Sequence, residues 1–200
     1  MSTKTPSSAL KTPAPLTPAD YLKKILTARV YDVAVETALE PARALSRRLH
    51  NTVLFKREDQ QPVRSFKLRG AYNKMARLPR EQLKRGVIAA SAGNHAQGLA
   101  WAAYRLGVQA ITVMPHGAPA TKIAGVAHWG ATVRQHGNSY DEAFAFAVEL
   151  AQRHGYRFLS AFDDADVIAG QGTVGIELAP HSPDVVIVPI GGGGLASGVA

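Results

Sequence analysis

The chain has 200 residues, of which 46% are apolar, enough for one full domain or for one domain and part of another. No apolar run approaches the ~20 residues of a membrane-spanning helix, and the lack of cysteine excludes disulfides, thiol nucleophiles and zinc–thiolate sites. The net charge is +8, but the basic residues are scattered and not interleaved with aromatic residues, so nucleic-acid binding is not expected.

The first 17 residues are rich in Ser, Thr and Pro, and we expect a disordered tail there. This tail lacks the apolar segment of a secretory signal, so a cytoplasmic location is expected by default. From Pro18 onward the apolar residues become regularly spaced. The spacing predicts helices at 18–28 and 40–51, a short strand at 52–58 and a helix at 65–78.

Strands and helices alternate from residue 86 onward. Strands are predicted at 86–91, 108–115, 131–136, 156–162 and 183–190, and helices at 94–107, 119–130, 139–155 and 168–179. Ser139 and Glu142 are expected to form a capping box. The alternation indicates an α/β fold with open, mostly parallel sheets flanked by helices. Residues 191–200 are predicted to form a loop and one helical turn. A helix of one turn buries almost no surface, so we expect the chain to be the N-terminal portion of a longer protein.

A run of four glycines, 191–194, follows the last predicted strand and precedes a helix. Glycines let the main chain approach an anion, and a helix N-terminus offers free N–H groups. The run matches neither G-x-G-x-x-G nor G-x-x-x-x-G-K-[ST]. It predicts a phosphate site formed by the main chain, with a flexible turn as the alternative.

The segment SAGNHAQG, residues 91–98, lies where a predicted strand turns into a helix. Ligands of open α/β sheets bind at such strand ends. Ser91, Asn94 and His95, together with free helical N–H groups, would suit a carboxylate. On spacing alone the alternative is favoured, in which Ser91 or Asn94 only caps the helix.

Lys67 lies near the start of the helix predicted at 65–78 and shares a face with Gly70 and Ala71, which would leave room for a planar group. A partly desolvated lysine has a lowered pKa and can form Schiff bases with carbonyls. The alternative is an ordinary solvated lysine. A cofactor with an aldehyde and a phosphate needs both a lysine and an anion loop, and an amino-acid substrate needs a carboxylate site. The three features together point to pyridoxal 5′-phosphate (PLP).

The chain resembles the fold-type II (tryptophan-synthase-β-like) PLP-dependent enzymes, and most of all the biosynthetic threonine dehydratases (threonine ammonia-lyases). Four segments carry this resemblance: LFKREDQQPVRSFKLRGAYNKM, ASAGNHAQGLAWAA, VIAGQGTVGIEL and VPIGGGGLASGVA. It runs from about Tyr21 to Ala200. It implies a two-lobed fold, with residues 18–85 and 167–200 in a large PLP-binding lobe, incomplete here, and residues 86–166 in a small lobe.

The resemblance also implies roles for the matching residues. Lys67 would carry PLP as a Schiff base and take the substrate's α-proton, Phe66 would neighbour the cofactor, and Asn94 would bind the ring's 3′-oxygen. The cofactor phosphate would be held by Gly191, Gly192, Gly193, Gly194 and the amide of Leu195. The substrate carboxylate would be held by Ser91, Ala92, Gly93, Asn94 and His95. No metal is expected, and the partner of the pyridine nitrogen would lie beyond Ala200.

The implied activity is β-elimination of water from L-threonine to give 2-oxobutanoate and ammonia, the first step of isoleucine biosynthesis. Serine dehydratase, serine racemase and threonine synthase activities remain alternatives, as does an inactive fragment that only binds a phosphate ligand. Ala92 stands where racemising relatives carry a second serine as an acid/base, which favours dehydration. Thr37-Ala38-Leu39 lacks the proline of the family's T-P-L, which affects a turn rather than the chemistry. L-Threonine, with L-serine as a second possibility, and a homo-oligomer (dimer or tetramer) are the expected substrate and assembly, with no nucleic-acid or membrane partner.

Overall fold

The computed structural model describes residues 15–200, so most of the N-terminal tail expected at 1–17 lies outside the described residues. The N-terminal elements are α1 (Pro18–Leu26), β1 (Leu39–Pro41), α2 (Arg43–Leu49), β2 (Leu54–Lys56), the 3-10 turn η1 (Glu58–Gln60), α3 (Lys67–Arg77) and α4 (Arg80–Leu83). There follow β3 (Val87–Ala90), α5 (Asn94–Leu106), β4 (Ala110–Met114), α6 (Ala120–His128), β5 (Thr132–Gln135), α7 (Tyr140–His154) and β6 (Arg157–Phe158). The last elements are α8 (Ala165–Leu178), the 3-10 turn η2 (Ala179–His181) and α9 (Gly194–Val199).

The main sheet has four parallel strands in the order β5-β4-β3-β6. Successive side chains of β3 point to opposite faces, as in any strand. Val87 and Ala89 pack in the apolar cluster that includes α5 and α3, whereas Ile88 and Ala90 pack against the alanines of α7. Helices therefore cover both faces, and the predicted α/β class with a parallel sheet is confirmed.

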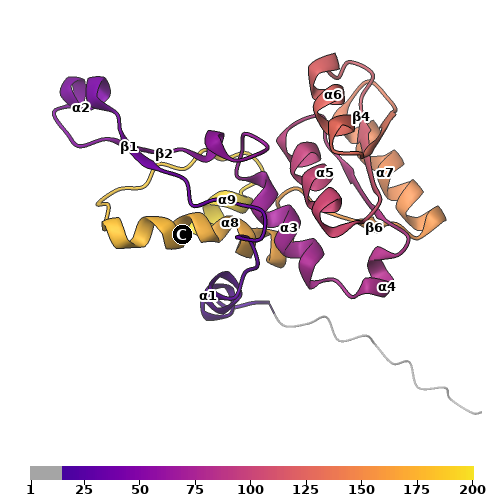
Figure 1. Cartoon of the computed structure of the whole chain (residues 1–200), viewed down its shortest axis with the longest axis horizontal. Coiled ribbons are helices and arrows are strands. Elements are labelled where there is room, and N and C mark those ends of the chain that lie inside the picture. Colours follow the sequence, from indigo (N-terminus) through magenta and orange to yellow (C-terminus); the bar gives the residue numbers. More distant parts are fainter. Residues whose placement is uncertain (1–14) are drawn as a thin grey trace, which may run out of the picture.

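The remaining elements lie beside this sheet (Figure 1). Helix α3 stands between the sheet with α5–α7 and the helices α8 and α9, and β1, α2 and β2 form a projecting arm. Strands β1 and β2 pair antiparallel, with Leu39 opposite Lys56. One apolar cluster runs from Leu68 and Met75 of α3 to Leu99 of α5, so core packing continues across residue 86. The division into lobes at 86 and 166 stays a prediction. No helix within residues 15–200 is long and apolar enough to cross a lipid bilayer.

Helix ends follow the predicted signals, with one difference. Gly107 and Gly155 adopt the left-handed conformation, with φ of 64° and 70°, at the ends of α5 and α7. The Ser139 hydroxyl accepts a hydrogen bond from the Glu142 amide at 3.2 Å, as expected. The Glu142 carboxylate, however, accepts from the amide of Asn138 at 2.6 Å. The capping box is therefore only half formed, because Gly137 lies directly against the Glu142 side chain and brings the next amide to it.

Two predicted strands and one predicted helix differ from the structure. Only Arg157–Phe158 of residues 156–162 pairs in the sheet, and the helix predicted at 40–51 begins at Arg43, after β1. Residues 183–190 form no strand with any described residue. Val185, Ile187 and Ile190 are 76%, 92% and 74% exposed. Their composition favours a strand, but a strand needs a hydrogen-bonded neighbour, and no described strand pairs with these residues.

Helices α3 and α8 cross with their backbones in contact. A Cβ atom on Gly170 would lie 2.6 Å from the Cα of Gly70, and one on Gly70 would lie 2.7 Å from the carbonyl oxygen of Val167. The Gln171 side chain accepts a hydrogen bond from the Gly70 amide at 3.1 Å. The expectation that Gly70 and Ala71 leave room for a planar group beside Lys67 is therefore wrong, because Gly70 faces α8 and Ala71 is buried in the core.

This crossing predicts that Gly170→Ala is destabilising. The added methyl group meets main-chain atoms that cannot rotate away, so we expect a loss of about 1–3 kcal/mol in the free energy of unfolding, measured by urea denaturation. Gly175→Ala in the same helix is the matched control. Its Cβ would find its nearest neighbour at 3.4 Å, and alanine favours a helix by roughly 0.5–1 kcal/mol over glycine. Equal stability of the two variants would contradict the close crossing.

Candidate active site

A cavity of about 280 Å³ lies between the start of α3 and the glycine loop. Its lining residues are Phe66, Lys67, Phe162, Pro189, Ile190, Gly191, Gly192, Gly193, Gly194 and Leu195. The structure thus brings together two of the three features singled out in the sequence. The third, the turn at residues 91–95, adjoins α3 through α5 but does not line this cavity.

Lys67 is the first residue of α3, and its side chain is half-buried. Its Nζ donates a hydrogen bond to the carbonyl oxygen of Ala161 at 2.8 Å and lies 5.3 Å from the centre of the Phe66 ring. Burial lowers the pKa of Lys67, because removal of water disfavours the charged ammonium. A Cβ on Gly98 of α5 would lie 2.9 Å from the carbonyl carbon of Lys67. The main chain of Lys67 is therefore fixed by α5, and its half-buried side chain lines the cavity. This placement does not fit an ordinary solvated lysine.

The glycine loop leads into α9 with its backbone strongly turned. Gly193 is the N-cap, with φ of 86°, and no described side chain caps the helix. A Cβ on Gly192 would lie 2.2 Å from the Phe162 ring, and one on Gly194 would lie 2.9 Å from the Phe162 carbonyl oxygen. The loop therefore needs glycine at these positions and leaves main-chain N–H groups available for an anion.

The turn at Ser91–His95 has the geometry of an uncapped helix start. Gly93 is the N-cap of α5, and no described side chain caps it. The Ser91 hydroxyl accepts from the amide of Gly93 itself, at 3.2 Å. Asn94 is exposed at the first position of the helix, and Ala92 is partly buried. The structure therefore contradicts the alternative in which Ser91 or Asn94 only caps the helix. The first amides of α5 are free to bind a carboxylate.

The imidazole of His95 lies in the core below this turn. Its Nε2 is 3.3 Å from the carbonyl oxygen of Leu159. Burial, assisted by the positive charge of Lys67 and opposed by the Leu159 hydrogen bond, lowers the pKa of His95 to about 4. The ring is therefore neutral at neutral pH, and its burial in the core leaves the main chain of His95 as the part nearest the surface of the turn.

A buried ion network flanks the first turns of α3. The fully buried guanidinium of Arg69 contacts Glu177 at 2.5 Å and Glu58 at 2.8 Å. Lys56 and the Tyr31 hydroxyl also contact Glu177, at 2.6 and 2.8 Å. Burial opposes the charge on Glu177, but Arg69 and Lys56 outweigh it and lower the pKa of the carboxyl group. The network ties α3 to η1, β2 and α8.

Three residues in or next to the site, Arg69, Ala161 and Phe162, were not singled out from the sequence. Arg69 carried no role of its own, because nothing in the local sequence marks partners on distant elements. Phe162 and Ala161 lie where the strand predicted at 156–162 ends. Ligands bind at the ends of parallel strands, which is why residues 91–98 were expected to form a site. The end of the strand predicted at 156–162 carries the same signal.

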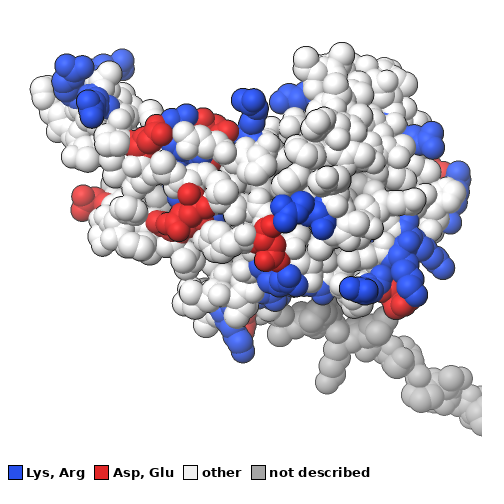
Figure 2. Space-filling view, viewed as in Figure 1, with Lys and Arg blue, Asp and Glu red and all other residues white. Residues whose placement is uncertain are grey.

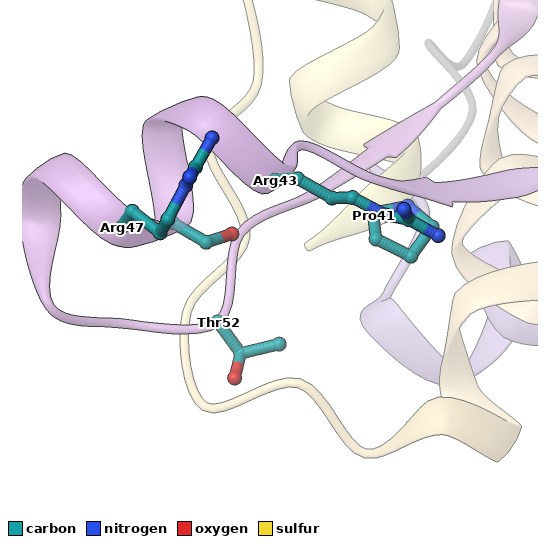
Figure 3. Close-up of a pocket in the computed structure, with 5 residues that line it drawn as sticks. Pro41, Arg43, Arg47 and Thr52 are labelled. Atoms are coloured by element: carbon teal, nitrogen blue, oxygen red, sulfur yellow. The ribbon is translucent and has the colours of Figure 1, made fainter.

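A larger cavity of about 570 Å³ lies on the projecting arm (Figure 3). It shares no lining residue with the cavity at Lys67. It is lined by Pro41, Arg43, Ser46, Arg47 and Thr52. Figure 2 shows basic side chains gathered over α2. The Ser46 hydroxyl is already occupied by the amide of Val53, at 2.9 Å. The lining residues include no carboxylate, histidine or lysine that could act as an acid or base, so we assign the chemistry to the smaller cavity at Lys67.

Comparisons with known proteins show which family the chain is similar to. A family model described as "Pyridoxal-phosphate dependent enzyme" matches residues 30–200. The chain is 59% identical over 187 residues to the biosynthetic L-threonine dehydratase IlvA of Burkholderia multivorans, covering 90% of this chain and 37% of that protein. It is 52% identical over 198 residues to the chloroplastic biosynthetic threonine dehydratase 1 of Solanum lycopersicum, covering 98% and 33%. The chain thus spans about a third of the length of these relatives.

Solved structures give the same likeness. The processed form of threonine deaminase isoform 2 from Solanum lycopersicum superposes with a TM-score of 0.87 at 50% identity, over 91% of this chain and 54% of that one. Maize serine racemase superposes with a TM-score of 0.85 at 32% identity, over 90% and 55%.

The buried imidazole predicts a pH effect on stability. In the unfolded chain His95 has its ordinary pKa of 6.5, while the folded value is about 4. Between these values only the unfolded chain binds the proton, so the free energy of unfolding falls as the pH is lowered. We expect this histidine to contribute a loss of about 2 kcal/mol between pH 7 and pH 5 in urea denaturation.

The His95→Gln variant should lack this fall in the free energy of unfolding between pH 7 and pH 5, whatever the stability of the variant at pH 7. The same slope in wild type and His95→Gln would show that His95 is not held neutral by the fold.

Proposed function

Because the chain belongs to the pyridoxal-phosphate dependent enzyme family, we propose that Lys67 holds PLP and that the protein dehydrates L-threonine to 2-oxobutanoate and ammonia. The observation that carries the proposal is that Lys67 lines the same cavity as a glycine loop with free main-chain amides. The likeness to biosynthetic threonine dehydratases supports the choice of reaction and a place in isoleucine biosynthesis.

The residues of the cavity fit PLP. Its aldehyde needs an amine, and burial lowers the pKa of Lys67 and so increases the unprotonated, nucleophilic fraction. Its phosphate needs N–H donors, and the loop from Gly191 to Leu195 has no side chain that competes for them among the described residues. Its ring needs apolar walls, and Phe66 and Ile190 supply them.

The division of labour follows from this placement. When bound, PLP supplies an electron-withdrawing ring that accommodates the charge developing at the substrate's α-carbon. Lys67 is the base that accepts the α-proton at Nζ, and its position beside the Ala161 carbonyl keeps the amine at the cavity wall. The β-hydroxyl leaves as water, and hydrolysis then gives 2-oxobutanoate and ammonia.

The substrate carboxylate is assigned to the turn from Ser91 to His95, where the first amides of α5 are uncapped. Asn94 is assigned to the 3′-oxygen of the cofactor ring, since its exposed amide can donate or accept. A two-lobed protein, with this turn on the small lobe and the glycine loop on the large one, would place the cofactor between them. A homo-oligomer remains a prediction, as does the cytoplasmic location, since relatives include proteins named as chloroplastic.

A serine racemase is the second candidate, favoured by the likeness to the maize enzyme. Racemisation needs a second acid/base on the opposite face of the α-carbon. Ala92, in the turn before α5, carries no group that can transfer a proton. We therefore place dehydration first.

Borohydride reduction of the PLP-loaded full chain, followed by peptide mapping, tests the centre of the proposal. We expect the pyridoxyl label on Lys67. Lys67→Ala should lose the label and at least ~100-fold in the rate of 2-oxobutanoate formation from L-threonine. Lys84→Ala, at an exposed position, is the control and should keep both. A label on another lysine, or none on the PLP-saturated protein, would remove Lys67 from the mechanism.

Substrate comparison tests the choice of reaction. We expect L-threonine to be turned over faster than L-serine and phosphohomoserine, and chiral chromatography to detect no D-serine, because Ala92 cannot reprotonate the second face. D-Serine formation comparable with deamination would favour the racemase instead.

A further inference from the structure

The turn between β6 and α8, residues 159–164, touches both halves of the site. The carbonyl oxygen of Ala161 accepts the hydrogen bond from Lys67 Nζ at 2.8 Å. The ring of the next residue, Phe162, occupies the place that a side chain on Gly192 would take, with ring atoms 2.2–2.6 Å from that Cβ position. The Phe162 carbonyl oxygen would lie 2.9 Å from a Cβ atom on Gly194. One short turn thus contacts the amine and the anion loop.

Packing in the core does not explain the position of Phe162. Its side chain is 37% exposed and belongs to neither buried apolar cluster of the described residues. The turn that carries it is ordered, since the Ser160 hydroxyl accepts hydrogen bonds from the amides of Asp163 and Phe162 at 3.0 and 3.4 Å. The ring therefore lies where a fixed backbone puts it, against the main chain of the glycine loop.

Such a contact matters most for a loop made of glycine. Glycine has the largest conformational freedom to lose, so a loop of four is ordered at a high entropic cost when it closes on an anion. A flat ring packed on Gly192 removes part of that freedom before the ligand arrives. Pre-ordering of this kind raises affinity without any direct contact with the ligand.

We propose that Phe162 is a positioning residue that pre-orders the glycine loop for the phosphate group of PLP. The inference rests on the proposed function, and it places the effect of Phe162 on the phosphate end of the cofactor. The proposed role predicts different effects on two ligands that share the aldehyde. PLP has a phosphate that needs the ordered loop, whereas pyridoxal has none.

The test is a titration of the apo form of the full chain with PLP and, separately, with pyridoxal, followed by the absorbance of the bound ligand. For Phe162→Ala we expect an increase of roughly tenfold in the Kd for PLP and little change for pyridoxal. Inorganic phosphate should compete with PLP less effectively in this variant than in the wild type. Phe162→Tyr keeps the ring and should restore the wild-type ratio of the two Kd values.

Phe144→Ala is the matched control. Phe144 is 39% exposed and lies on α7, where it contacts the ring of Phe158 rather than the glycine loop. Its removal should leave both Kd values unchanged. Should Phe162→Ala melt before it can be titrated, Phe162→Leu takes its place, with a smaller loss for PLP expected and again none for pyridoxal.

Equal weakening of both ligands, or of neither, would overturn the role of Phe162 while leaving the proposed function intact. A wild-type protein that binds neither ligand at Lys67 would overturn the proposed function and this inference together.

Discussion

Main-chain contact between α3 and α8, at Gly70 and Gly170, determines where Lys67 stands. Two helices can approach this closely only where neither carries a side chain, and the Gln171 amide then bridges to the Gly70 N–H. Helix α8 meets α9 in the same way at Gly172 and Gly198, and α9 starts in the glycine loop. The amine and the loop are thus positioned relative to each other by packed helices, which hold a geometry more tightly than flexible loops do.

The buried charges near this crossing place a second constraint on α3. Arg69 points away from the cavity into a cage of carboxylates from η1 and α8. Removal of one partner from such a network leaves a charge without water or a counter-ion, which typically costs about 3–5 kcal/mol. Arg69 is therefore fully paired with carboxylates on one side of α3. Lys67, two residues earlier, keeps a half-buried amine on the other side, with no carboxylate partner among the described residues.

Much of this arrangement could be predicted from the sequence because it depends on local signals. Apolar strands alternating with capped helices gave the parallel sheet, and the glycines at 107 and 155 ended their helices as predicted. The meeting of Lys67 with residues 191–194 was predicted by joining three motifs and a family resemblance. The positions of Gly70 and Phe162 were not predictable, because helical spacing says which residues share a face and not which neighbour that face meets. The segment 183–190 has the composition of a strand, but a strand also needs a partner.

The exposed segment that contains Val185, Ile187 and Ile190 has a consequence for the behaviour of this 200-residue chain in solution. A stretch rich in valine and isoleucine with unpaired backbone groups is a template for pairing with another molecule, and only Pro189 interrupts it. The net charge of +8 opposes such self-association through long-range repulsion. Salt shortens the range of that repulsion to about 10 Å at 0.1 M. We therefore expect higher ionic strength to favour self-association of this chain through residues 183–190.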